Sequence, residues 1–267
     1  MAVLTISRKF RSGSQEIGKM LADKVGYTYI GKERILSDMQ RAGERCGQLL
    51  TDLDEAAPSL WERFDNEYRG FVSLIESYIF DYAWRDRAII VGRGGAHLLC
   101  DIPFVLRVRL SAPLEYRIDR TMREDQVDKE TAKWMVQTVD RRRAGYVQAN
   151  YGVDWNDQRC YDMIFNTGVQ SHELITDILA SALTDRDRKV TPEWKEVLLG
   201  RKIAAKIRAS AFLDPKLNIP TLQVEYAKGS LILKGTAHSR AEYDKVEKLA
   251  KKLAKSIPVC NNLRFRK

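Results

Sequence analysis

The sequence ISRKFRSGSQEI occupies residues 6–17, where a strand pattern changes into a helix pattern. Residues 3–7 are rich in β-branched and other apolar side chains, which is typical of a buried strand. Polar residues follow, and from Ile17 onward the apolar side chains recur with helical spacing. The chain therefore begins with a strand, a loop and a helix. Because backbone N–H groups at the start of a helix attract anions, the loop is a candidate phosphate site.

This loop carries an incomplete phosphate-binding pattern. A P-loop reads GxxxxGK[ST], in which the lysine reaches the outer phosphates and the hydroxyl holds magnesium. In that register Arg8 stands for the first glycine, and Gly13 stands for the second, directly after Ser12. Ser14 then stands for the lysine and Gln15 for the Ser or Thr. The pattern alone favours a plain strand, turn and helix over a nucleotide site.

Short apolar runs bounded by turns recur along the first two-thirds of the chain. They occupy residues 27–30, 88–91, 104–110 and 163–166, with helix patterns between them. One of these helix patterns is an apolar face through residues 61–82. Short strands that are apolar on both faces are typical of a parallel sheet covered by helices on each side. The sequence therefore predicts an α/β protein with a doubly wound parallel sheet.

The C-terminal part of the chain differs in charge and in pattern. Residues 193–267 contain 17 Lys and Arg against 7 Asp and Glu, a net charge of +10, whereas the rest of the chain sums to −1. Helix and strand patterns in this part predict a second, smaller α+β domain with the order αββαβ. We expect a first domain over residues 1–184, a charged linker over 185–196 and the second domain over 197–267.

Several motifs of the first domain together resemble the cytidylate kinase-like family, which has a P-loop kinase fold. The opening ISRKFRSGSQEI resembles the start of that family, with a degenerate phosphate loop. IVGRGG at residues 90–95 and DRRR at residues 140–143 resemble its strand ending in GRG and its arginine-containing lid. YDMIFNTG at residues 161–168 resembles its last strand. The resemblance covers nearly all of residues 1–184 and implies a doubly wound sheet of P-loop kinase type.

This resemblance also implies phosphoryl transfer between nucleotides, which depends on positioning and on cations more than on a covalent nucleophile. Arg141 and Arg143 would act on the transferring phosphoryl group from the lid. Gly92, Arg93 and Gly94 would bind the acceptor monophosphate. The residues implied to bind ATP with Mg²⁺ are Arg8, Ser12, Gly13, Ser14, Gln15, Arg120 and Arg123.

Two departures from the family pattern bear on activity. Ser14 replaces the lysine of the phosphate loop, and Val91 stands where cytidylate kinases place an aspartate that could serve magnesium. The sequence therefore identifies no magnesium ligand. In the absence of the lysine, Arg8 or Lys9 could lean over the phosphates. The arginines that fit a solvated surface better than a site are Arg117, Arg142 and Arg159.

The second domain resembles a BON domain, a small α/β module associated with binding to phospholipid or to a partner protein. The resemblance rests on VEYAKGSLILKGTA at residues 224–237 and on NNLRF at residues 261–265. A solvated helix face explains its exposed lysines, and so does binding to an anionic surface such as lipid headgroups. Nucleic acid is less favoured, because no aromatic residues are interleaved with the lysines. These lysines are Lys245, Lys248, Lys251, Lys252 and Lys255.

The function predicted from the sequence is an ATP-dependent nucleoside monophosphate kinase, with CMP or dCMP as the acceptor by resemblance alone. The alternative is a kinase fold that binds or senses nucleotide with little or no transfer, and engages a partner or an anionic surface through the basic module. A third hypothesis is phosphorylation of another small molecule. Because the chain has no apolar run of transmembrane length and its four cysteines form no CxxC pair, we expect a cytoplasmic protein without a zinc site or disulfide framework.

Overall fold

The computed structural model describes residues 1–42, 58, 59, 62 and 65–265. The chain forms two compact units, and each is described by itself. The first unit comprises Met1–Pro58 and Asp86–Val190. The second comprises Ser59–Arg85 and Thr191–Lys267.

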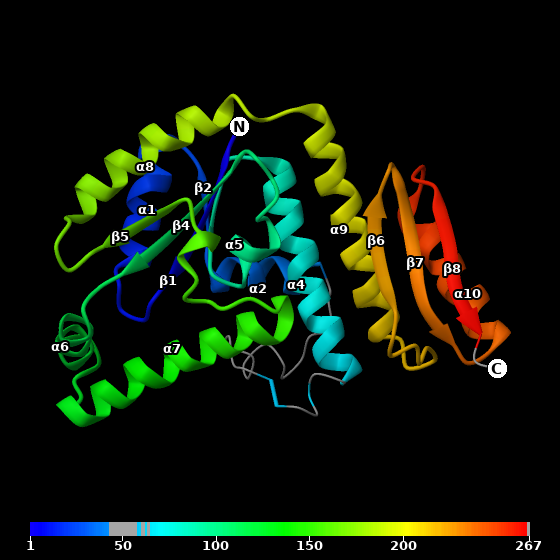
Figure 1. Ribbon diagram of the computed structural model, residues 1–267, viewed down its shortest axis with the longest axis horizontal. Coiled ribbons are helices and arrows are strands. Elements are labelled where there is room, and N and C mark those ends of the chain that lie inside the picture. Colours follow the sequence, from blue (N-terminus) through cyan, green and yellow to red (C-terminus); the bar gives the residue numbers. More distant parts are fainter. Residues whose placement is uncertain (43–57, 60–61, 63–64, 266–267) are drawn as a thin grey trace. The chain divides into compact units, whose positions relative to one another are not determined.

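The first unit is built on a parallel sheet of five strands in the order β2-β3-β1-β4-β5 (Figure 1). The chain places β2 and β3 on one side of β1, and β4 and β5 on the other. The C-terminal end of β1 is therefore a topological switch point, where open α/β sheets bind ligands. The strands are β1 Val3–Arg8, β2 Thr28–Ile30, β3 Ala88–Val91, β4 Val105–Ser111 and β5 Met163–Asn166.

Helices α1 and α8 bury one face of this sheet. Ile17 and Leu21 of α1 and Leu179 of α8 belong to one hydrophobic core with Leu4 and Ile6 of β1. The predicted doubly wound α/β class is confirmed. The helices of the first unit are α1 Ser14–Val25, α2 Lys32–Arg41, α5 Gly95–Leu98, α6 Leu114–Asp125, α7 Lys129–Tyr151 and α8 His172–Asp187, with a 3-10 turn at Gln158–Cys160.

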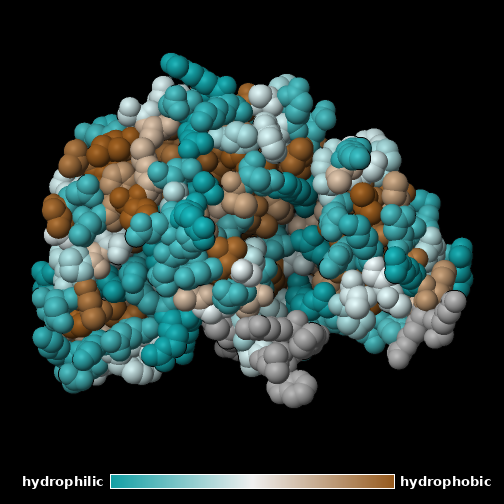
Figure 2. All heavy atoms as spheres, viewed as in Figure 1, coloured by the Kyte–Doolittle hydropathy of each residue, from teal (hydrophilic) through white to brown (hydrophobic). Residues whose placement is uncertain are grey.

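Strand β5 forms one edge of the sheet and is only partly buried. Ile164 of this strand, Val169 after it and Leu174 in α8 are exposed. Figure 2 shows hydrophobic side chains at the surface over β5 and α8. The buried core of the first unit therefore lies around β1, β3 and β4, and the edge strand contributes less to it.

The second unit contains a three-stranded sheet in the order β6-β7-β8, in which β6 and β7 are antiparallel and β7 and β8 are parallel. Leu231 and Leu233 of β7 share a core with Ile207 of α9 and Val246 of α10. This arrangement confirms the predicted smaller α+β domain with the order αββαβ. Its elements are α9 Pro192–Phe212, β6 Gln223–Ala227, β7 Ser230–Ala237, α10 Arg240–Ala254 and β8 Val259–Phe265.

Helices α8 and α9 extend into the segment 185–196 that the sequence predicts as a linker, so that residues 188–191 lie between them. The start of α9 has a local cause. The side chain of Thr191 accepts a hydrogen bond from the N–H of Trp194, and Pro192 takes the first helical position. The domain bounds 1–184 and 197–267 stay predictions.

Helix α4, Asn66–Arg85, lies between β2 and β3 in the sequence but belongs to the second unit. It packs against α9 through two ion pairs. Arg208 of α9 donates a hydrogen bond to Glu76 at 2.5 Å, and Lys202 donates one to Asp81 at 2.6 Å. These pairs join a helix from the middle of the chain to the C-terminal unit.

The apolar face of residues 61–82 predicts burial of this helix without identifying its partner. In the structure even Ser73, Glu76 and Asp81 are buried, so that α4 is covered on nearly every side. Trp61 and Phe64, at the start of the predicted face, lie outside the described residues. Within the described part of the chain, no helix has both the length and the apolar character needed to cross a membrane.

Candidate active site

Strand β1 ends at Arg8, and a short loop leads from it into α1 at Ser14. Gly13 precedes the helix with a φ of +74°, a left-handed conformation that glycine adopts without strain. The buried hydroxyl of Ser12 donates to the carbonyl of Lys9 at 2.8 Å and holds the turn. No side chain among the described residues caps the N-terminus of α1. Backbone N–H groups and the helix dipole at such a position suit an anion.

Two basic side chains lie over the loop glycine. A Cβ atom built on Gly13 would lie 2.5 Å from Nε2 of His172 and 3.4 Å from Nη1 of Arg120. Arg120 forms ion pairs with Glu16 and with Glu124, the latter at 2.6 Å. Burial raises the pKa of the Glu16 carboxyl, but its backbone hydrogen bond and Arg120 outweigh burial, so the pKa lies below its ordinary value. The loop is therefore bordered by a guanidinium that already holds a carboxylate.

The arginines predicted for ATP and for the lid do not all converge. Arg123 is exposed on α6, where its Nε donates to the carbonyl of Asp119 at 3.3 Å. Arg141 is exposed on α7. Arg143 is partly buried, and its Nη1 donates to the carbonyl of Arg8 at 3.1 Å. Of the two predicted lid arginines, the structure therefore places Arg143 at the end of β1.

Arg117 lies on the buried side of α6, which corrects its predicted surface position. It is 4% exposed, and its Nη1 donates to Oδ2 of Asp140 on α7 at 2.8 Å. The other oxygen, Oδ1, accepts from the N–H of Phe10 at 2.9 Å. Arg117 and Asp140 thus connect α6, α7 and the phosphate loop. Arg142 and Arg159 are exposed, as the sequence predicts.

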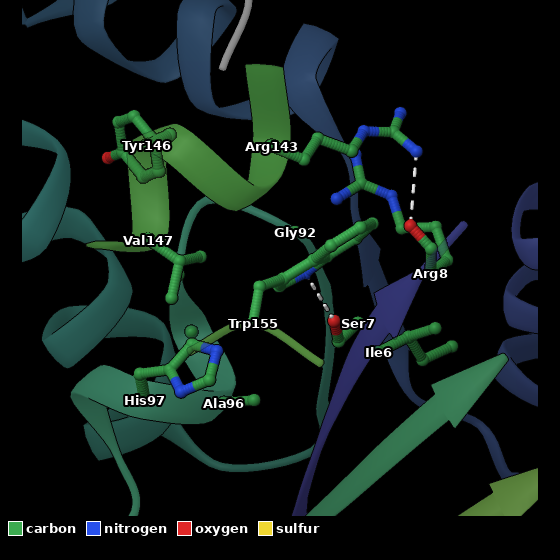
Figure 3. A pocket seen from close by; sticks show the side chains of 12 residues that line it. Ile6, Ser7, Arg8, Gly92, Ala96, His97, Arg143, Tyr146, Val147 and Trp155 are labelled. Carbon is green, nitrogen blue, oxygen red and sulfur yellow. Dashed lines mark hydrogen bonds between the residues drawn. The ribbon is translucent and has the colours of Figure 1, made fainter. Parts of the chain in front are cut away.

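A cavity lies at the C-terminal ends of β1 and β3 and is bordered by α7 (Figure 3). In this view the side chains of Arg8 and Arg143 lie on one side of it, and His97 lies on the other. The cavity therefore coincides with the topological switch point of the sheet. Its lining residues are Ile6, Ser7, Arg8, Gly92, Gly94, Gly95, Ala96, His97, Arg143, Tyr146, Val147 and Trp155.

The loop after β3 contains three consecutive residues with a positive φ, namely +81° for Gly92, +54° for Arg93 and +70° for Gly94. A Cβ atom on Gly94 would collide with the ring of Tyr151 on α7, so glycine permits this close contact. Arg93, which the resemblance assigns to the acceptor phosphate, is 5% exposed, and its carbonyl accepts from the hydroxyl of Tyr151 at 3.5 Å. The cavity lining contains Gly92 and Gly94 but not Arg93.

Sequence reasoning missed the buried arginine beside the cavity, Arg109 of β4. Its guanidinium carbon lies 4.1 Å from the ring centroid of Trp155 and 5.2 Å from that of Tyr161. It donates to the carbonyl of Trp155 at 2.7 Å and to the hydroxyl of Tyr161 at 2.9 Å. Ser7 accepts from the indole N–H of Trp155 at 3.0 Å (Figure 3). The available signal was an arginine inside an apolar strand, which requires buried partners.

Residues 3–169 match the cytidylate kinase-like family. The chain belongs to this family. It is 23% identical to a cytidylate kinase of Methanocaldococcus jannaschii over 184 residues, which cover 68% of this chain and 97% of that protein. It is 25% identical to a cytidylate kinase of Methanosarcina barkeri over 195 residues, which cover 71% of this chain and 99% of that protein.

A solved structure also resembles this member of the cytidylate kinase-like family. It is an uncharacterized protein from Eubacterium ventriosum, with a TM-score of 0.54 and 20% sequence identity, and the match covers 69% of this chain and 99% of that one. At this identity the likeness concerns the fold alone. The family match ends at residue 169 and does not include α9 to β8. Family membership agrees with a sheet of P-loop kinase type and implies the use of ATP and Mg²⁺ in general terms.

Proposed function

We propose that the first unit catalyses ATP-dependent phosphoryl transfer to a nucleoside monophosphate, with CMP or dCMP as the acceptor. The observation that carries this proposal is the cavity at the end of β1, where Arg8 and Arg143 lie together. Two guanidinium groups suit a phosphate or a transferring phosphoryl group. The choice of a cytosine nucleotide rests on the names of the relatives from M. jannaschii and M. barkeri. A reaction that consumes ATP agrees with a cytoplasmic location.

On the donor side, Arg120 takes the role of the missing P-loop lysine. Its guanidinium lies beside Gly13 and is held there by Glu16. A phosphate at the N-terminus of α1 would replace the carboxylate of Glu16 as the partner of this guanidinium. His172 supplies a second basic group at the same position. This assignment stands beside the sequence hypothesis that Arg8 or Lys9 compensates for the lysine.

Replacing Arg120 with alanine is expected to weaken ATP binding roughly 10- to 100-fold, because a hydrogen bond to a charged group contributes about 1.5–3 kcal/mol. Isothermal titration calorimetry of the full chain measures this change. Lys19→Ala is the matched control, since Lys19 is exposed on α1 and should leave ATP affinity within about twofold. Equal ATP affinity in Arg120→Ala and the wild type would contradict the assignment.

The magnesium of this reaction would be held chiefly by the nucleotide. Among the described residues, no group of three or more His, Cys, Asp or Glu could hold a metal ion. Mg²⁺ in kinases usually keeps several waters and takes one or two protein oxygens together with the phosphates. Ser14 and Gln15, in the first turn of α1, offer a hydroxyl and an amide oxygen for that purpose. When bound, the ion neutralises charge on the phosphates.

A coupled assay that detects ADP tests the proposed reaction with ATP, Mg²⁺ and a panel of CMP, dCMP, UMP, AMP and GMP. The highest turnover is expected with CMP or dCMP. The alternative is a protein that binds or senses nucleotide without transferring phosphate. It is favoured by Ser14 and Val91, which replace the lysine and the aspartate of the family pattern. Nucleotide binding without turnover of any acceptor would support that alternative. ATPase activity that no monophosphate stimulates would indicate another small-molecule acceptor.

For the second unit, we propose a BON-like module that binds an anionic lipid surface, with a protein partner as the alternative ligand. Lys248 and Lys252 are exposed on α10, and Lys255 is exposed directly after its last residue. Lys245 and Lys251 are paired with acidic residues instead. We expect co-sedimentation of the full chain with phosphatidylglycerol vesicles, and loss of binding when the three exposed lysines are replaced with glutamate. Binding that survives this replacement contradicts the proposal.

A further inference from the structure

One buried side chain of the cavity has an atom without a hydrogen-bonding partner. His97 of α5 is 9% exposed, and its Nε2 forms no hydrogen bond with any residue that the structure describes. In Figure 3 the imidazole lies at the side of the cavity, across from Arg8 and Arg143. Buried polar atoms in folded proteins are nearly always hydrogen-bonded, so a partner that is not among the described residues is expected here.

The surroundings of His97 keep its ring uncharged and fixed in orientation. Burial, followed by the charges of Arg109 and Arg107, lowers the pKa of His97 to about 4. The imidazole is therefore neutral at pH 7, with one N–H group and one lone pair. Tyr151 stacks on it with 6.2 Å between ring centroids, and Tyr161 meets it edge-on at 5.9 Å. A neutral ring held in this way suits an uncharged hydrogen-bonding group rather than a phosphate.

The cavity thus has different chemistry on its two sides. Arg8 and Arg143 supply cationic groups on one side, and His97 supplies a neutral hydrogen-bonding atom on the other (Figure 3). A nucleoside monophosphate has the same division, with an anionic phosphate and uncharged hydroxyl and base groups. The cavity measures about 20 Å³ for water-sized molecules, which is room for one water. An acceptor nucleotide is larger than this, so its entry requires side chains that border the cavity to shift.

We propose that His97 is a specificity-determining residue whose Nε2 exchanges a hydrogen bond with an uncharged hydroxyl or base group of the acceptor nucleotide. This inference rests on the proposed function, because it concerns the same site. The competing occupant of the position is a resident water molecule, which would satisfy Nε2 without contributing to recognition. If the acceptor is the partner of Nε2, replacing His97 weakens acceptor binding. If a resident water is the partner, the replacement leaves acceptor affinity unchanged.

The test compares CMP binding to the full chain in the wild type, His97→Phe and His97→Gln by isothermal titration calorimetry. Phenylalanine keeps a planar ring but removes the hydrogen bond, whereas a glutamine amide can bond in place of Nε2. We expect CMP binding to weaken roughly 10- to 100-fold in His97→Phe and less than about threefold in His97→Gln. ATP affinity and Tm should change little in either variant. Parallel titrations with dCMP and UMP show whether the sugar hydroxyl or the base is the partner.

Each other outcome decides against the inference. Equal CMP affinity in the wild type and His97→Phe overturns it and leaves the kinase proposal standing. Weaker binding of both CMP and ATP in His97→Phe, together with a lower Tm, indicates a structural role for His97 and also overturns it. If the wild type binds none of the monophosphates, the kinase proposal itself fails and this inference fails with it.

Discussion

Replacing Arg208 with methionine is expected to lower the free energy of unfolding of the second unit by about 3–5 kcal/mol. Glu76 is 9% exposed, and Arg208 donates to its carboxylate at 2.5 Å. The same guanidinium donates to the carbonyl of Val224 at 2.9 Å. Removal of Arg208 therefore leaves a carboxylate and a carbonyl buried without this partner. Urea-induced unfolding followed by circular dichroism measures the change.

This loss of stability should depend on pH. Burial raises the pKa of Glu76 above its ordinary value of 4.5, and Arg208 opposes that rise. Because the folded state then binds the proton of Glu76 more tightly than the unfolded chain does, the contribution of Glu76 to stability is largest below its unfolded pKa and is lost as pH rises through its folded pKa. Without Arg208 this pKa rises further. The deficit of Arg208→Met is therefore expected to be smaller at about pH 5 than at about pH 8.

Two further variants separate the buried pair from a general effect of losing a charge. In Glu76→Leu combined with Arg208→Met, both charges are absent, and most of the lost stability should return. Lys234→Met breaks the exposed pair of Lys234 and Glu225, whose side chains are 46% and 49% exposed, and should cost less than about 1 kcal/mol. If Arg208→Met and Lys234→Met lower the free energy of unfolding by similar amounts, the buried carboxylate of Glu76 is not stabilised by Arg208, and the prediction is contradicted.

The strands of the first unit could be predicted from the sequence because most of them are buried on both faces. The apolar run at residues 88–91 coincides with β3, in which every residue is buried. The run at residues 163–166 also coincides with a strand, β5, although that edge strand is only partly buried. The position of the loop before α1 could also be predicted from the sequence. A change from strand spacing to helix spacing fixes where β1 ends, and Gly13 marks the turn between them.

The partners of buried charges could not be predicted in the same way. Glu76 fits the polar positions of a helix pattern, and its partner Arg208 lies 132 residues away in the sequence. Arg109 lies 46 residues from Trp155, whose carbonyl and ring it contacts. A periodic pattern shows which side of an element is buried, but it contains no information about which distant side chain meets that element. For that reason the predicted site contained the loop and its glycines but omitted Arg109.

Replacing Arg143 with alanine is expected to lower kcat of the proposed kinase reaction about 10²- to 10³-fold, or roughly 3–4 kcal/mol. The guanidinium lies at the cavity, where it donates to the carbonyl of Arg8 and lies 5.9 Å from the ring centroid of Phe10. Negative charge spreads over the oxygens of a transferring phosphoryl group, and an arginine fixed beside it stabilises that charge. Single-turnover kinetics with ATP and CMP measures the chemical step directly.

Two further variants test whether the effect on kcat is specific to the guanidinium of Arg143. Arg142→Ala is the matched control, because Arg142 is exposed on the same helix and should leave kcat within about twofold. Arg143→Lys keeps the charge but loses the planar pair of donors, so its kcat should lie between those of the wild type and Arg143→Ala. If the interaction forms mainly in the transition state, kcat and kcat/KM fall together while ATP affinity is retained. A rise in KM with kcat unchanged would instead assign Arg143 to ground-state binding of the acceptor, and the proposed charge stabilisation would then have to come from another residue.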